Sequence, residues 1–190
     1  MKSYLFFIFV LLAISIVFFS GCTQTYLAEN STGNTTINTT TDTNPSIEAP
    51  TKNYTYAGSF DDNGKEICTI DGKPVIRLYS TTWCPHCQWI KSTFDKVAKE
   101  YAAAGKIVAY HWEMDTKDNT LTDTVETSIP AEESQYFSEG NPNGYVPYFV
   151  FGCKYIRTGN KYEGLTGGLE AEESEFRGLI EKILDETKTS

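Results

Sequence analysis

Positive charge is scarce in this sequence. Its 190 residues include 16 lysines and arginines against 25 aspartates and glutamates, so the formal net charge is −9 at pH 7. Proteins that bind nucleic acids neutralise phosphates with clustered lysine and arginine side chains. The acidic residues are scattered along the chain, so we interpret the charge as a solvated surface and expect no nucleic-acid partner.

The sequence also lacks an apolar run of the about 20 residues that a membrane-spanning helix requires. Its longest apolar run extends from Tyr4 to Phe19, follows the basic residue Lys2, and leads through small residues to Cys22. This pattern is typical of a signal peptide, which we place at residues 1–21.

The residues Phe19-Ser20-Gly21-Cys22 resemble a lipoprotein lipobox, although that motif prefers an aliphatic residue where this chain has phenylalanine. The resemblance implies cleavage before Cys22 and a diacylglyceryl group on its sulfur. The alternative is an N-terminal anchor that is not cleaved. Both alternatives place the rest of the chain outside the cytoplasm, anchored to the outer face of the cell membrane.

Large apolar residues are nearly absent from residues 22–53, where threonine and asparagine dominate. Such a stretch buries too little surface to offset the entropy of ordering it, so we expect a flexible tether. Its N-x-S/T sites are candidates for glycosylation where the cell has the machinery. These sites are Asn30, Asn34, Asn38 and Asn53.

From residue 54 onward the sequence has the pattern of a mixed α/β domain without an internal repeat. The expected order is β-α-β followed by β-β-α, with a polar segment at 118–143 between the two halves. Strands are expected at 74–80, 107–112, 148–151 and 155–157. Helices are expected from the residues after Cys87 to Gly105 and at 131–137. A C-terminal helix is also expected, with glutamates from Glu170 at its start, an apolar stripe at 176–184, and Lys188 near its end.

The five cysteines do not form the two matching pairs that are usual for structural zinc. Cys84 and Cys87 form a C-x-x-C step between a predicted strand and a predicted helix, whereas Cys68 and Cys153 are far apart in sequence. His111 lies within an apolar strand, and we expect it to be a core residue. The context of the C-x-x-C step therefore favours thiol redox chemistry over zinc binding, and we predict no cofactor.

A cysteine at a helix N-terminus meets unpaired backbone N–H groups and the positive end of the helix dipole, which favour the thiolate. We therefore expect Cys84 to be the exposed attacking sulfur and Cys87 to be the resolving thiol. Pro85 suits the first helical turn, where its missing N–H is not needed. The imidazole of His86 is expected to stabilise the Cys84 thiolate further.

Residues 79–87 resemble the active-site segment of the thioredoxin superfamily, with Trp83 in the position of the family's tryptophan. Residues 145–150 resemble its second signature, in which a cis-proline faces the C-x-x-C step. The resemblance implies that Pro147 packs beside Cys84 and keeps metals off the sulfurs. It also implies that Trp83 and the backbone of Val146 bind the substrate.

The thioredoxin resemblance implies that residues 54–190 form a central mixed sheet flanked by helices, with an enlarged loop before the cis-proline. The C-P-H-C motif is that of the bacterial disulfide oxidase family DsbA, but too few residues separate Cys87 from Pro147 to house the inserted helical domain of that family. Thioredoxins have a buried aspartate where this chain has Leu78. The proton acceptor for Cys87 therefore remains open, with Glu113 as a candidate.

In the thioredoxin fold the strand after Pro147 runs antiparallel to the strand at 74–80, so Cys153 is expected to approach Cys68. We predict a structural disulfide between these two cysteines, which an exported domain permits. The alternatives are a pair of buried free thiols, separate roles, or a second redox pair.

Together these features predict a membrane-tethered extracytoplasmic thiol–disulfide oxidoreductase that oxidises or isomerises protein disulfides. Its partners would be protein thiols or disulfides and a membrane or soluble redox protein that recharges the C-x-x-C step. One alternative is an extracytoplasmic reductase, for example for cytochrome maturation. Others are a Cu(I) metallochaperone using Cys84, Cys87 and His86, and a redox-silent scaffold domain.

Overall fold

The computed structural model describes residues 54 and 56–189. The predicted signal peptide, the lipidation site at Cys22 and the predicted tether lie outside the described residues. The same holds for the glycosylation candidates Asn30, Asn34, Asn38 and Asn53. Within the described part of the chain, no helix is long and apolar enough to cross a membrane.

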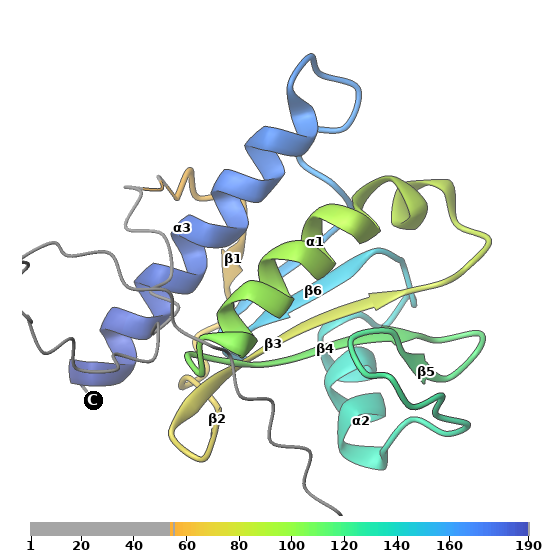
Figure 1. Ribbon diagram of the computed structural model, residues 1–190, viewed down its shortest axis with the longest axis horizontal. Helices are drawn as coiled ribbons and strands as arrows, with labels where there is room; N and C mark the ends of the chain where they lie inside the picture. The colour runs from red at the N-terminus through yellow and green to blue at the C-terminus, as the bar shows by residue number, and fades with distance from the viewer. Residues whose placement is uncertain (1–53, 55, 190) are drawn as a thin grey trace, which may run out of the picture. The chain divides into compact units, whose positions relative to one another are not determined.

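A mixed sheet forms the centre of the domain (Figure 1). Its longest strand, β3 (Lys73–Ser80), lies between a parallel neighbour, β4 (Val108–Glu113), and an antiparallel neighbour, β6 (Tyr148–Phe151). The strand order is β1-β7-β6-β3-β4-β5, and β2 pairs with the start of β3. The remaining strands are β1 (Asp61–Asp62), β2 (Thr69–Ile70), β5 (Asp118–Asn119) and β7 (Tyr155–Thr158).

Side chains of β3 alternate between the two faces of the sheet, and each face carries an apolar cluster. Helices therefore cover both faces. Ile76 and Leu78 belong to an apolar cluster with residues of α1 (Pro85–Ala103) and α3 (Gly168–Thr189). These two helices pack against each other (Figure 1). Tyr79 belongs to a second apolar cluster on the opposite face, under α2 (Ala131–Gly140). The sheet thus holds the start of α1 at the end of its central strand.

The predicted α/β class and the order β-α-β then β-β-α are confirmed, as is the helix within the polar segment before the cis-proline. The sequence did not reveal β1, β2 and β5, because strands of two residues are too short to show an alternating pattern. The C-terminal helix extends from Gly168 to Thr189, so the glutamates from Glu170 onward lie at its start and Lys188 lies in its last turn, as predicted.

Candidate active site

Cys84 caps the N-terminus of α1. Its backbone is extended, with φ −79° and ψ 118°, and Pro85 is the first helical residue, as predicted. The N–H of Gln88 donates to the Cys84 carbonyl at 3.0 Å and closes the first turn. The Cys84 sulfur therefore lies at the helix end where unpaired N–H groups favour an anion.

The Val146–Pro147 peptide bond is cis, as the resemblance implied. The thiol of Cys84 lies 3.7 Å from the carbonyl oxygen of Val146, so this segment lies directly beside the reactive sulfur. Pro147 is buried, whereas Val146 remains partly accessible. Cys84 and Val146 are 62 residues apart in sequence, so their contact brings the two motifs together in one site.

The expectation that Cys84 is exposed is wrong, because only 4% of the residue is accessible to solvent. The segment that contains Val146 packs against its sulfur and leaves little of it open. The accessible surface nearby in sequence is aromatic: Trp83 is 71% exposed and Tyr145 is 62% exposed.

His86 contacts an acidic partner that the sequence did not reveal. Its Nδ1 lies 2.8 Å from Oε2 of Glu163, and Asn160 donates to both the Glu163 carboxylate and the His86 carbonyl. Burial acts to raise the pKa of Glu163, but the hydrogen bonds from Asn160 and His86 outweigh it and lower that pKa. The predicted effect of His86 on the Cys84 thiolate stays a prediction.

Cys87 is also a free thiol, and its side chain is hydrogen-bonded to Cys84. Burial, followed by the hydrogen bond with Cys84, raises the pKa of Cys87 to about 12. This thiol therefore keeps its proton at neutral pH unless a nearby group removes it. A raised pKa agrees with the role of resolving thiol that is predicted for Cys87.

A cavity of about 280 Å³ lies next to Cys87. Glu113 at the end of β4 lines this cavity, and its Oε1 accepts a 2.6 Å hydrogen bond from Nζ of Lys91. Leu78, which occupies the position of the thioredoxin aspartate, is fully buried in the apolar core. Glu113 is thus the carboxylate that the fold brings to the cavity of the resolving cysteine.

Asp115 supports the loop before the C-x-x-C step, and the sequence reasoning missed it. Its carboxylate accepts hydrogen bonds from the backbone N–H of Thr82 at 3.1 and 3.2 Å and from the Thr82 hydroxyl. Burial acts to raise the pKa of Asp115, but the bonds from Thr82 outweigh it and lower that pKa. Its place just after a strand that runs parallel to β3 could have suggested this role.

His111 is a core residue, as predicted. Its ring is fully buried and lies within hydrogen-bond distance of Ser80, Asp95 and Thr120, at 2.7, 2.6 and 2.9 Å. Each ring nitrogen thus has a protein partner.

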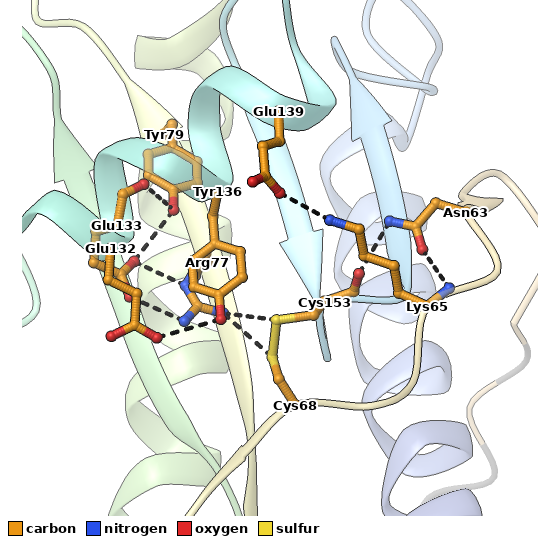
Figure 2. Close-up of a disulfide and its surroundings, with 10 residues drawn as sticks. All are labelled: Asn63, Lys65, Cys68, Arg77, Tyr79, Glu132, Glu133, Tyr136, Glu139 and Cys153. Atoms are coloured by element: carbon orange, nitrogen blue, oxygen red, sulfur yellow. Dashed lines mark hydrogen bonds and ion pairs between the residues drawn. A yellow bond between two sulfur atoms is a disulfide. The ribbon is translucent and has the colours of Figure 1, made fainter.

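The predicted bond between Cys68 and Cys153 is confirmed: the two sulfurs form a disulfide, and the Cα atoms lie 5.5 Å apart (Figure 2). The disulfide links the loop between β1 and β2 to the turn between β6 and β7.

Comparisons with known proteins agree with this architecture. Residues 59–132 match the model of the family described as Thioredoxin, a stretch that includes the C-x-x-C step and β4. Among curated proteins, "Bloodstream-specific protein 2" of Trypanosoma brucei brucei is 37% identical over 92 residues, which cover 48% of this chain and 17% of the relative. No solved structure matches.

The family match indicates thiol redox chemistry in general terms, because it includes the C-x-x-C step at the start of α1. The cis-proline beside Cys84 lies outside the matched residues and agrees with the same assignment. The described domain has the thioredoxin fold, and its residues 59–132 are similar to the thioredoxin family.

Proposed function

We propose that this chain is a membrane-tethered extracytoplasmic thiol–disulfide oxidoreductase that oxidises or isomerises protein disulfides. The observation that supports it most is the contact of Cys84 with the cis Val146–Pro147 segment, above a second free thiol at Cys87. This arrangement provides a nucleophile at a helix N-terminus, a resolving thiol and a backbone carbonyl for the substrate.

Oxidation of a substrate dithiol starts from the Cys84–Cys87 disulfide. A substrate thiolate attacks the Cys84 sulfur, and the electron pair of the breaking bond leaves with Cys87, which takes up a proton. A second substrate thiolate then attacks the substrate sulfur of the mixed disulfide and releases Cys84 as a thiolate. The substrate has lost two electrons, and a redox partner returns Cys84 and Cys87 to the disulfide.

Isomerisation uses the same atoms from the reduced state. Cys84 attacks a substrate disulfide, and either another substrate thiol or Cys87 resolves the mixed disulfide. Because its pKa is about 12, Cys87 must lose its proton to a neighbouring group before it can attack. Glu113 lines the same cavity and is the acceptor that we propose.

The substrate is proposed to be an extended polypeptide with apolar side chains near its cysteine. Trp83 directly precedes Cys84, Tyr145 directly precedes Val146, and both aromatic side chains are largely exposed. Exposed aromatic side chains bind apolar groups with little loss of side-chain entropy. The partly accessible Val146 can offer its backbone to a substrate strand.

The decisive experiment replaces one cysteine at a time in the full chain. In the Cys68→Ala/Cys153→Ala background, which removes the second cysteine pair, Cys84→Ser should abolish both insulin reduction and oxidation of a reduced peptide, and Cys87→Ser should accumulate a mixed disulfide at Cys84. Cys22→Ser, assayed in detergent, is the matched cysteine control and should keep full activity. Activity in the Cys84→Ser variant would disprove the mechanism.

The direction of electron flow can be measured as the reduction potential of Cys84–Cys87 against glutathione. A value near about −120 mV, as in DsbA, supports oxidation, whereas a value near about −270 mV, as in thioredoxin, indicates a reductase.

Membrane attachment is tested by metabolic labelling with a fatty-acid analogue. The wild type should be labelled and Cys22→Ser should not; equal labelling would contradict lipidation at Cys22.

A further inference from the structure

Arg77 is a buried cation that lies against the Cys68–Cys153 disulfide (Figure 2). Its Nε and Nη2 donate to the two carboxylate oxygens of Glu133 at 2.8 and 2.9 Å, and the ring of Tyr136 lies 4.1 Å from its Cζ. Its remaining nitrogen, Nη1, points at the disulfide and lies 3.5 Å from the sulfur of Cys153 and 3.6 Å from that of Cys68.

A guanidinium is a poor partner for a disulfide but a good one for a thiolate. Sulfur in its neutral forms accepts hydrogen bonds weakly, and burying a charge costs more than burying an apolar side chain of similar volume. Burial acts to lower the pKa of Arg77, but the bonds with Glu133 outweigh it, so the side chain stays charged. The surroundings of the disulfide therefore suit an anionic sulfur, which forms only when the bond is reduced.

The two sulfurs differ in access. Cys68 is partly accessible in the loop before β2, whereas only 5% of Cys153 is exposed. A nucleophile that approaches from solvent therefore meets the Cys68 sulfur first. Cys153 then becomes the leaving group, with Nη1 of Arg77 already in contact with it.

Backbone hydrogen bonds hold both cysteines independently of the disulfide. The N–H of Cys68 donates to the Gly152 carbonyl at 2.9 Å, and the N–H of Val75 donates to the Cys68 carbonyl at 3.3 Å. The side-chain amide of Asn63 donates to the Cys153 carbonyl at 3.0 Å. The sulfurs would thus stay adjacent after reduction and could form the bond again.

The backbone at Cys153 also indicates that its side chain is needed there. Cys153 has φ 60° in the tight turn closed by the 3.2 Å bond from the Lys154 N–H to the Phe151 carbonyl. Glycine or asparagine is preferred at such a turn position, and other residues adopt this conformation at a cost. The turn itself therefore does not favour cysteine at this position, and its bond to Cys68 explains its presence.

We propose that Cys68–Cys153 is a second redox-active disulfide, which accepts two electrons from a dithiol that attacks Cys68, with Arg77 stabilising the Cys153 thiolate. One thiolate of the dithiol bonds to the Cys68 sulfur, the disulfide breaks, and its electron pair leaves with Cys153. The second thiol of the dithiol loses its proton and attacks the first, which releases Cys68. The dithiol becomes a disulfide, and the domain gains two thiols once protons are taken up.

This second site does not depend on the C-x-x-C site. Cys68 and Cys153 lie at the start of β3, as the bonds of Val75 and Gly152 show, whereas Cys84 follows the end of that strand. The full-length chain with Cys84→Ser and Cys87→Ser isolates the disulfide, so failure of this proposal and failure of the proposed function are distinguishable.

The first measurement equilibrates that double variant in buffers of reduced and oxidised dithiothreitol. Cysteines are trapped by alkylation and quantified by peptide mass spectrometry, and near-UV circular dichroism follows the fold. We expect reversible reduction with the domain folded, and glutathione should form its mixed disulfide at Cys68. A bond that opens only when the domain unfolds, or a glutathione adduct mainly at Cys153, would overturn the proposal.

The second measurement compares two variants in the same background. Arg77→Met with Glu133→Gln removes the ion pair together and should shift the reduction equilibrium at least about tenfold toward the disulfide, which corresponds to about 30 mV. Glu133→Gln alone, the matched control, leaves Arg77 without its carboxylate and should shift the equilibrium toward the thiols. A purely structural disulfide predicts easier reduction in both variants, because both loosen the packing, and that result would contradict the proposal.

Discussion

Glu113 and Lys91 form a 2.6 Å ion pair beside the cavity that Cys87 lines, although they belong to β4 and α1. The pair occupies the region where a resolving thiol needs a proton acceptor. Leu78, at the position of the thioredoxin aspartate, cannot accept a proton, so the carboxylate comes from a different strand in this chain.

Glu113→Gln should slow resolution by Cys87 at least about tenfold at pH 7, because the neutral amide accepts no proton from the thiol. The measurement is the lifetime of the mixed disulfide that reduced Cys84 forms with a disulfide-bonded peptide, followed by quench and mass spectrometry. Glu66→Gln, an exposed glutamate, is the matched control. An unchanged lifetime in Glu113→Gln would exclude this residue as the acceptor.

The reduced domain should lose stability at alkaline pH through Cys87. Its pKa is raised to about 12 in the folded state, against 9.0 as the ordinary value, so the contribution is present below about pH 9 and is lost as pH rises toward 12. Urea unfolding of the reduced wild type and of Cys87→Ala should give a stability difference that narrows over this range. A difference independent of pH would contradict the raised pKa.

Loss of the Cys68–Cys153 bond should destabilise the domain by about 2–4 kcal/mol, since it closes a long loop in the unfolded chain. The sequence separation of the two cysteines is 85 residues. Because small domains are stable by about 5–15 kcal/mol, the Cys68→Ala/Cys153→Ala variant should remain folded. Chemical denaturation under oxidising conditions measures the difference, and a variant that does not fold would show that the bond is essential.

Glu186 should make the domain sensitive to acid. Burial acts to raise its pKa, but hydrogen bonds from Lys182, Tyr155 and Lys154 outweigh it and lower that pKa to about 2. Its stabilisation is therefore present above about pH 4.5 and is lost as pH falls toward 2.

Glu186→Gln should lower the stability at pH 7 by about 1 kcal/mol, because the site is partly screened by solvent, and should flatten the loss between pH 4.5 and 2. The neighbouring Asp185→Asn is the matched control, since its pair with Lys188 lies on the exposed surface. Equal effects of the two substitutions in urea titrations would contradict the assignment.

Local patterns in the sequence predicted the elements that form the site. The strand before the C-x-x-C step, the helix after it and Pro85 at the first turn depend on neighbouring residues, so composition and spacing were sufficient. Cys84 was the exception: its burial depends on the Val146 segment, which packs on it from 62 residues away.

The sequence alone determined the redox class, because Cys84, Cys87 and Pro147 lie in two recognisable motifs whose order is visible in one dimension. Only the tertiary structure decided which side chains surround the sulfurs. Lys91 meets Glu113 across 22 residues, Arg77 meets Glu133 across 56, and His86 meets Glu163 across 77. Such pairs depend on strand register and on which face of the sheet a side chain occupies, and a shift of one residue would turn each strand side chain to the opposite face.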